Sequence, residues 1–578
     1  MPHDYLAADR LADLIMKGGV TSGVVYPPAI DQIVRRFYLH GIGGTSAGAI
    51  AASLAAAAEF RRRHGSADGY LKLAEIPGEI SGEGRLLQLF RPDPSTRDLF
   101  HLGLRLKDFG GAGLWERTRL VSKLLYLFTS DSPLADFNRN GSGLCTGMAF
   151  PPPGSGELPP LTQWLSDKLD DLAGVEGPLT FGMLAKAPRP DAFQSVLTSR
   201  FSIQLQLIST CLTFGRPYAL PRLDDKFHFD PAQMARLLPR HVVDYMVAQA
   251  QQSPPTKPDN VPWPTDRTLL PLPVGSKMPV ILATRMSLSF PALFTLVPLW
   301  HPNENARDRR FEPVYFSDGG ITSNLPIHFF DSPLPRWPTL AINLQYAQVA
   351  GEYGRPDVEP STGTWMAPTH SSGVLDLFRQ FLNAQSAAGK VMGLGSAILS
   401  AARGWNDNSL LPLPGYRDRV VEVWLDPDEG GMNLNMPPCI LRKLNNKGTE
   451  AGRLLVERFA DHPPEHTMSW YSHRRGRYWS SMAGLAEHLH RLRDSIDHPH
   501  PGDADLWDLI NDPDAVSFRM TPQQRAEFER ATRSLVAAID AWKASQICRS
   551  EKQAVFCPFC DGPAPHVTLQ PRAPLSGD

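Results

Sequence analysis

The sequence has few cysteines, no long apolar run and almost no net charge. Its apolar stretches, such as GAIAASLAAAA, are shorter than the ~20 residues that span a bilayer. A formal net charge of −2 argues against nucleic acid as a partner, because such proteins usually carry a basic surface. The six cysteines are too scattered for a disulfide framework, which favours a reducing compartment. They are Cys145, Cys211, Cys439, Cys548, Cys557 and Cys560.

The amino-terminal segment MPHDYLAADR contains acidic residues and lacks a basic region followed by an apolar core. We therefore expect no signal peptide and a cytoplasmic protein, with peripheral contact at a membrane left open. The 54 prolines predict many loops and edges between the regular elements.

The first 62 residues alternate between strand and helix patterns. Strands are expected at 11–17 and 38–43, and helices from about residue 27 and over 47–62. This order predicts an α/β fold with a parallel sheet. Residues 64–200 are proline-rich and less regular, so we interpret them as a long insertion with some helices. Later strands are expected at 201–213, 279–284, 313–316, 339–345 and 419–425, and helices at 232–250, 374–402, 446–460, 478–494 and 522–546.

A serine between small residues follows the second expected strand. The motif Gly44-Thr45-Ser46-Ala47-Gly48 fits a nucleophile elbow, in which a sharp turn between strand and helix presents the serine. Small neighbours are needed because strand and helix pass close together at such a turn. An ordinary glycine-rich loop with an incidental serine is the alternative interpretation.

Two further motifs stand at the ends of expected strands. KGGVTSG, from Lys17 to Gly23, can turn backbone N–H groups toward an anion. It lacks the Lys-Ser or Lys-Thr of a phosphate-binding P-loop, and Val20 replaces the middle glycine of a dinucleotide fingerprint. In Ser317-Asp318-Gly319-Gly320, an aspartate at the end of an expected strand is followed by a glycine turn, which can place its carboxylate at a site beside the sheet edge. The alternative interpretation is an ordinary Asp-Gly turn without a functional role.

Together and in this order, the three motifs resemble those of the patatin family of serine lipid acyl hydrolases. ATRMSLSFPALF (283–294) and SNLPI (323–327) are also similar to segments of that family. The resemblance covers about 10–62 and 201–346, and residues 414–434 more weakly resemble larger bacterial patatin-like proteins. It implies a three-layer α/β sandwich with a central, mainly parallel sheet, a long insertion and a helical carboxy-terminal region.

The resemblance also implies the roles of individual residues. Ser46 is expected to be the nucleophile and Asp318 the general base of a dyad without histidine. The backbone N–H groups of Gly18, Gly19, Val20 and Ala47 would form an oxyanion hole, and Gly44, Gly48, Gly319 and Gly320 are the motif glycines. The expected reaction is cleavage of a phospholipid or other acyl-lipid ester through an acyl-enzyme, without metal or cofactor. We expect a catalytic domain over 1–440 and a mainly helical region over 441–578.

The sequence departs from the family pattern in its glycine loop. Val20 replaces the usual third glycine, and Ser22 stands where a basic residue is usual, which tempers the expectation of a phosphate headgroup. An α/β-hydrolase would place its serine after several strands and would need a later histidine. The downstream histidines, His328, His370 and His462, lie in no recognisable catalytic setting.

Other functions and sites remain open from the sequence. Acyl transfer, thioester cleavage and non-catalytic lipid binding are the alternatives to ester hydrolysis. Cys548, Cys557, Cys560 and His566 could bind zinc, but free thiols fit their spacing better. The basic runs 61–63 and 473–479 are interpreted as solvated faces, the second with a possible interfacial role because it contains aromatic residues.

Overall fold

The structure is a computed structural model that describes most of the 578 residues. The described ranges are 5–19, 21–106, 143–148, 154, 156–197, 199–252, 261–305, 309–346, 363–369, 394, 401, 411, 415–426, 428–430, 433–461, 467–512 and 520–544. The expected helices over 374–402, except for residues 394 and 401, and the candidate zinc ligands lie outside these ranges.

The amino-terminal strand–helix units form as the sequence predicts. Strand β1 (Arg10–Met16) leads through the 3-10 helix η1 (Ser22–Val25) into α1 (Tyr26–Val34), and β2 (Phe37–Gly44) leads into α2 (Ala47–Arg63). Prolines occupy the first turn of α1, where a missing N–H costs nothing. The four predicted elements of the first 62 residues are confirmed.

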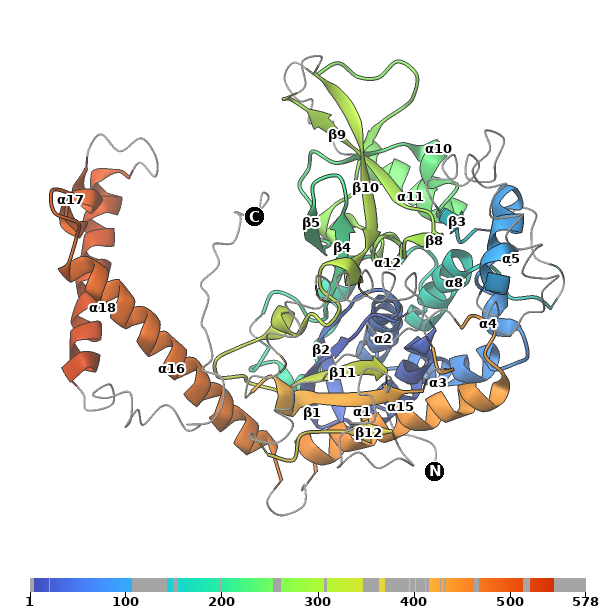
Figure 1. Ribbon diagram of the computed structural model, residues 1–578, viewed down its shortest axis with the longest axis horizontal. Helices are drawn as coiled ribbons and strands as arrows, with labels where there is room; N and C mark the ends of the chain where they lie inside the picture. Colours follow the sequence, from blue (N-terminus) through green and yellow to red (C-terminus); the bar gives the residue numbers. More distant parts are fainter. Residues whose placement is uncertain are drawn as a thin grey trace.

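A single large sheet runs through the centre of the molecule (Figure 1). Its central strands are parallel, in the order β13-β11-β1-β2-β4, while the strands at both flanks are antiparallel. The mixed α/β class with a mainly parallel centre is thereby confirmed. The remaining strands of the sheet are β4 (Gln204–Cys211), β5 (Arg216–Leu220), β6 (His228–Phe229), β7 (Leu270–Pro271), β9 (Val297–Asn303), β10 (Arg310–Asp318), β11 (Thr339–Tyr346), β12 (Thr364–Trp365) and β13 (Val420–Leu425).

Two of the later predictions need correction. The strands expected near 201–213, 313–316, 339–345 and 419–425 are confirmed, but 279–284 belongs to helix α12 (Val280–Ser287). Every residue of α12 is buried, so its apolar run carries no periodicity that separates a helix from a strand. The helix expected over 232–250 is interrupted near Pro239 and forms α10 (Pro231–Met234) and α11 (Arg240–Gln251).

Alternate side chains of the central strands enter two different apolar cores. Leu14 and Met16 of β1 pack into the main core with the helices, whereas Ile15 points into a smaller cluster with Leu325 and Ile327. This alternation follows from the two-residue period of a strand. The sheet therefore has a thick helical layer on one face and the short segment after β10 on the other, which gives three layers.

Part of the expected insertion belongs to the helical layer. Helices α3 (Asp68–Ile80) and α8 (Leu161–Ala173) both pack against α2, and their apolar residues lie in the main core. These segments are not a peripheral insertion. The smaller elements of this region are α4 (Arg85–Gln88), α5 (Arg97–Leu106), β3 (Gly143–Cys145) and α9 (Phe181–Lys186), and β3 pairs with β8 (Ala292–Phe294).

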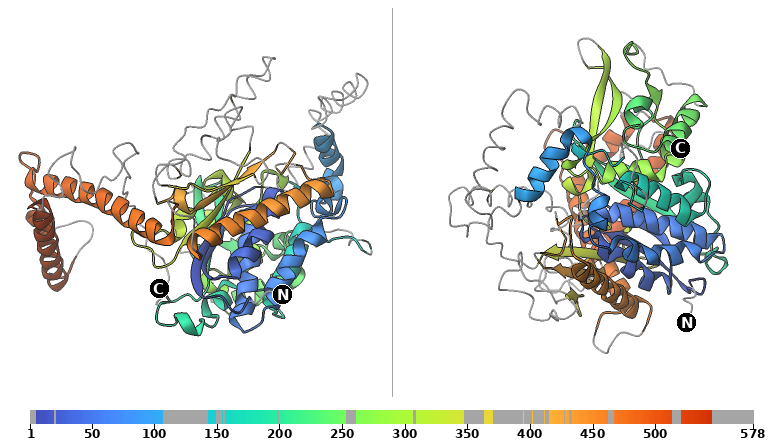
Figure 2. Two further views of the ribbon diagram at one scale, coloured as in Figure 1. Left: turned by 90° about the horizontal axis from the view of Figure 1, so that it is seen from below. Right: turned by 90° about the vertical axis from the view of Figure 1, so that its right-hand side faces the viewer.

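The described helices of the carboxy-terminal region fall into two parts. Helix α15 (Pro438–Phe459) packs along α1 and so belongs to the core, which places the expected boundary at 441 inside this helix. Helices α16 (Trp470–Asp497), α17 (Leu506–Asn511) and α18 (Pro522–Ala544) form an arm that extends away from the sheet (Figures 1 and 2). Among the described residues, no helix is long and apolar enough to cross a membrane.

The run 473–479 joins this arm to the core and is only partly solvated. His473 is fully buried, with its Nδ1 atom 2.7 Å from Asp418 Oδ2. Arg477 Nη2 donates to Asp331 Oδ2 at 2.7 Å. The interpretation of this run as a solvated face is therefore wrong for these two residues, whose charges meet partners inside the protein.

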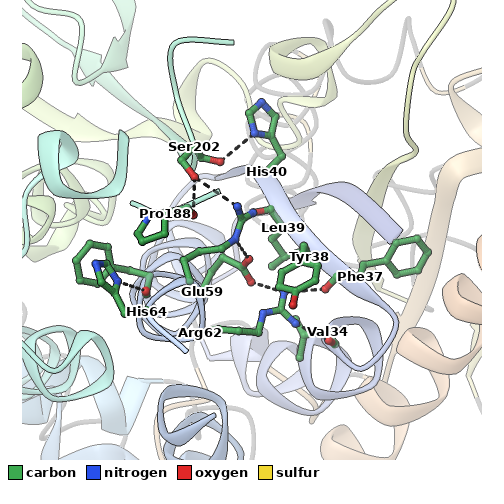
Figure 3. A network of polar contacts seen from close by, with 12 residues as sticks. Val34, Phe37, Tyr38, Leu39, His40, Glu59, Arg62, His64, Pro188 and Ser202 are labelled. Carbon is green, nitrogen blue, oxygen red and sulfur yellow. Dashed lines mark hydrogen bonds and ion pairs between the residues drawn. The ribbon is translucent and has the colours of Figure 1, made fainter. Parts of the chain in front are cut away.

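The basic run 61–63 also points largely inward. Arg62 and Arg63 are buried, and each contacts one carboxylate oxygen of Glu59, which has no exposed surface. Figure 3 shows Arg62 beside Glu59. Burial alone would raise the pKa of Glu59, but the two guanidinium groups outweigh it and lower that pKa. Arg62 also donates to the carbonyl oxygens of Val34 and Phe37, which ties α2 to the end of α1 and the start of β2.

We predict that Glu59→Gln destabilises the fold by about 3–5 kcal/mol, because it leaves two buried guanidinium groups without a counter-charge. The exposed Glu75→Gln on α3 is the matched control and should change stability by less than about 0.5 kcal/mol. Chemical denaturation followed by circular dichroism measures both. Equal midpoints for the two variants would contradict the structural role of this cluster.

We also predict a pH dependence of stability from Asp13 of β1. Burial raises the pKa of Asp13 to about 7, although hydrogen bonds from the Trp337 side chain and the Gly41 N–H partly offset this effect by lowering the pKa. The folded state thus keeps a proton that the unfolded chain releases near pH 4, so this group costs stability as the pH rises from about 4 to 7. Asp13→Asn should flatten that part of the melting-temperature profile; an unchanged profile would contradict the prediction.

Candidate active site

Ser46 lies at the turn between β2 and α2 with a backbone conformation that few residues adopt. Its φ is 55° and its ψ is −126°, and only one other non-glycine residue of the described chain, Ala292, has a positive φ. Such a conformation costs of order 1–3 kcal/mol and persists only where the surroundings enforce it. The predicted sharp turn at the serine is therefore present, and the serine directly precedes the first turn of a 17-residue helix.

The motif glycines allow backbone to pass directly over backbone. A Cβ atom on Gly44 would overlap the carbonyl of Gly48 and lie 2.9 Å from Met16 O. A Cβ atom on Gly48 would overlap the same Met16 carbonyl and lie 2.7 Å from Lys17 O. The first turn of α2 thus rests on the end of β1 without room for a methyl group at either position.

The glycine loop after β1 lies against this turn. A Cβ atom on Gly18 would come within 3.0 Å of Ser46 Cβ, which places the loop beside the serine. The Gly18 N–H donates to Asn324 O at 3.0 Å, while the N–H groups of Gly19 and Ala47 have no hydrogen bond within the described part of the chain. Val20 lies outside the described residues.

Asp318 approaches the same edge of the sheet from the opposite direction. It ends β10, which runs antiparallel to β4, and it pairs with Ser209 of that strand. Two residues earlier in β4, Leu207 pairs with Gly44 of β2. Because neighbouring strands lie about 4.8 Å apart, Asp318 stands two strand spacings, about 10 Å, to the side of β2 and near its carboxyl end, where Ser46 follows.

The turn after Asp318 is fixed by the aspartate itself. Asp318 Oδ1 accepts a hydrogen bond from Gly320 N–H at 2.7 Å, and the side chain is 1% exposed. A Cβ atom on Gly319 would overlap the carbonyl of Ile208 in β4. Gly319 is therefore required by its contact with the β4 backbone, whereas a Cβ atom on Gly320 would meet the side-chain oxygens of Asn324 and Asp318.

Asn324 connects all three motifs, and its role was not anticipated. Its carbonyl oxygen accepts hydrogen bonds from Gly18 N–H at 3.0 Å and from Thr45 Oγ1 at 2.9 Å. Its side-chain oxygen fills the space that a Cβ atom on Gly18 or Gly320 would occupy. The segment SNLPI marks the position of Asn324, but a contact made through a main-chain oxygen leaves no signal in the sequence.

Two serines, one at the end of α12 and one just after it, were also missed, because their contacts join segments far apart in the sequence. Ser287 Oγ accepts a hydrogen bond from Ser46 N–H at 3.3 Å, and Ser289 O accepts one from Asp318 N–H at 3.0 Å. Both lie in ATRMSLSF, which was noted only as a similarity. This segment contacts the serine and the aspartate at once.

Ser22 stands where the family usually has a basic residue, and it is buried. It is 1% exposed and packs against Gly430, at which a Cβ atom would lie 2.6 Å from Ser22 Cβ. Lys17, at the start of the loop, donates from Nζ to Asn343 Oδ1 at 2.7 Å. The glycine loop therefore turns a small, neutral residue inward at this position.

Histidines of the described chain make their contacts elsewhere. His40 bonds to Ser202 O, His228 to Lys226 O and His473 to Asp418. His328 packs edge-on against Phe329, and no histidine ring is hydrogen-bonded to Ser46 in the part of the chain that the structure describes. His370 and His462 lie outside that part. Over the same residues, no group of three or more potential metal ligands occurs.

We predict that Gly48→Ala destabilises the protein by about 3 kcal/mol, since the added methyl group would overlap backbone that cannot move aside. Gly78→Ala on α3 is the matched control, because a Cβ atom there has open space around it. This control should be neutral or stabilising by about 0.5–1 kcal/mol. Thermal melts of both variants measure the difference, and equal melting temperatures would refute the packing argument.

Comparison with known proteins identifies the family of the chain. Residues 14–331 match the family model described as patatin-like phospholipase. A protein of Rhizobium meliloti (strain 1021) named RpoH suppressor is 31% identical over 636 aligned residues, which cover 92% of this chain and 95% of the relative. Its name states no chemical activity. The crystal structure of VipD from Legionella pneumophila aligns over 97% of this chain and 94% of its own, at 14% identity and a TM-score of 0.26. The chain belongs to the patatin-like phospholipase family.

Proposed function

We propose that the protein is a serine acyl hydrolase that cleaves a carboxylic ester of a lipid. One observation carries the proposal: the strained Ser46 precedes a helix beside a glycine loop, and the buried Asp318 ends β10, two strands away from β2 in the same sheet. A strained backbone at a functional residue is typical of nucleophiles that the fold must hold exposed to a substrate. Membership of the family supports lipid esters as the substrate class.

The proposed reaction uses the two side chains in two steps. Ser46 Oγ attacks the ester carbonyl carbon while its proton passes to the Asp318 carboxylate. The bond to the alcohol then breaks, and the alcohol leaves with that proton. Water attacks the acyl-enzyme in the second step, Asp318 accepts a proton from the water, and Ser46 Oγ regains it as the acid is released.

Backbone donors would stabilise the oxyanion that forms in each step. We assign this role to the N–H groups of Gly19, Val20 and Ala47, since Gly18 N–H already donates to Asn324 O. Losing one such donor typically costs about 3 kcal/mol of barrier. The amino terminus of α2 adds the positive end of a helix dipole at the same point.

The substrate is proposed only as far as a lipid or acyl ester. The buried Ser22 offers no positive charge to a phosphate headgroup, so the loop does not by itself favour a phospholipid. Acyl transfer and thioester cleavage would use the same acyl-enzyme, and a lipid-binding module would need neither Ser46 nor Asp318. No cofactor and no nucleic acid take part in the proposed reaction.

We predict that Ser46→Ala and Asp318→Asn each lower ester hydrolysis by about 1000-fold or more, with melting temperatures close to that of the wild type. A panel of p-nitrophenyl esters, phospholipids, lysophospholipids and acyl-CoA, each with and without an alcohol acceptor, separates hydrolysis from transfer. Ser46→Gly is a useful companion variant. It should be equally inactive but about 1 kcal/mol more stable than Ser46→Ala, because glycine tolerates the positive φ. Undiminished turnover by Ser46→Ala would overturn the proposal.

A further inference from the structure

Helix α12 contains an arginine that is buried without a carboxylate partner among the described residues. Arg285 is 0% exposed, and its guanidinium donates to Ser289 Oγ at 2.5 Å, to Thr295 O at 2.9 Å and to Thr146 O at 3.2 Å. Burial lowers its pKa to about 10. A charge held this deeply is costly unless it is paired. Three neutral oxygens accept hydrogen bonds from the two terminal nitrogens, and the Asp93 carboxylate attracts the charge from beyond ion-pair distance. The buried Nε makes no hydrogen bond among the described residues.

One route leads from Arg285 to the proposed general base. Ser289 accepts the guanidinium hydrogen bond at Oγ, and the same hydroxyl donates back to Arg285 O at 2.8 Å. The carbonyl of Ser289 then accepts hydrogen bonds from Asp318 N–H at 3.0 Å and from Ser317 Oγ at 2.9 Å. The end of β10 is thus attached to the residue that Arg285 holds.

A second route leads from the same segment to the proposed nucleophile. Ser287 Oγ accepts a hydrogen bond from Ser46 N–H at 3.3 Å, which joins the strained residue to this segment. Ser209 Oγ of β4 lies 3.0 Å from Met286 O and 2.8 Å from Ser317 O, so its single proton can be donated to either carbonyl. All the residues that make these bonds are buried, including Ser46, which is 7% exposed.

The segment is also held from its far side. Arg285 reaches Thr295 and Thr146, which follow directly after β8 and β3, the two strands of the small second sheet. Between Ser289 and Thr295 lies Ala292, whose φ of 67° is the other strained backbone of the described chain. The guanidinium donates hydrogen bonds to residues on both sides of this strained turn. Its planar group with five donors can reach both acceptors at once, whereas a lysine ammonium lacks this fixed, forked geometry.

We propose that Arg285, Ser287 and Ser289 are positioning residues that fix the place of Ser46 relative to Asp318. The inference rests on the proposed function, because it assigns these residues to the proposed dyad. None of the three touches the reacting atoms: Ser287 holds the backbone of the nucleophile, Ser289 holds the backbone of the base, and Arg285 keeps both on one rigid turn.

Steady-state kinetics of the full chain with a soluble p-nitrophenyl ester test the proposal, together with the rate at which a fluorophosphonate labels Ser46. Ser287→Ala should lower kcat and the labelling rate about fivefold with KM unchanged, as expected for the loss of one neutral hydrogen bond. Arg285→Lys should lower kcat and the labelling rate about 100-fold, again with KM unchanged. Complete labelling counts the active sites, and both rates are expressed per active site.

Ser53→Ala is the matched control. Ser53 Oγ is fully buried and lies 2.7 Å from Thr284 Oγ1 on α12, so the variant removes an equally buried hydroxyl contact to this helix away from Ser46 and Asp318. It should lower the melting temperature about as much as Ser287→Ala and leave kcat unchanged. If Ser287→Ala and Ser53→Ala both keep the wild-type kcat per labelled site, the three residues are merely structural and the proposal is overturned.

The same measurements separate this proposal from the proposed function. Fluorophosphonate labelling of the wild type but not of Ser46→Ala supports the nucleophile whatever the positioning variants show. Wild-type rates in Arg285→Lys and Ser287→Ala, with Ser46 still labelled, refute the positioning role alone. A wild-type protein that is neither labelled nor active refutes both.

Discussion

The close approach of two backbones at the start of α2 is the constraint on which the site depends. The first turn of this helix rests on the carbonyl oxygens of Met16 and Lys17, so no side chain fits at Gly44 or Gly48. The chain can change direction in that space only by a sharp turn, and Ser46 takes the strained conformation that results. The glycine loop after β1 is brought beside the serine by the same contact. The strained backbone that makes Ser46 a candidate nucleophile is therefore produced by the packing of α2 against the end of β1.

Charged residues in this protein hold the framework together more than they shape a surface. Glu59 forms ion pairs with two arginines of the same helix, α2, and Asp331 forms ion pairs with Arg419 and Arg477 where the helical arm begins. Arg285 differs from these arginines, because its hydrogen-bond partners are neutral oxygens near the proposed dyad rather than a carboxylate. Buried charges are costly when their partners are lost, so these contacts favour the one arrangement of the elements that keeps the partners together.

The core extends beyond the residues that match the family model. Helix α15 packs on α1, and a Cβ atom on Gly448 would overlap the carbonyl of Val25 in η1. The loop before α15 is held by the buried ion pair of Glu429 with Lys447, and its Gly430 packs on Ser22. The carboxy-terminal half thus supports the glycine loop from behind, although the matched residues end at 331.

The sequence by itself determined the local features: the first two strand–helix units, the sharp turn at Ser46 and the glycine turn at Asp318. Each depends on residues adjacent in the chain, whose conformational preferences are readable one motif at a time. Only the tertiary structure decided that 279–284 is a helix, that Arg62 and His473 point inward, and that Ser287 and Asn324 contact the proposed site. Burial on all sides removes the periodicity that distinguishes helix from strand, a charged residue does not reveal which way it faces, and hydrogen bonds between segments hundreds of residues apart exist only once the chain has folded.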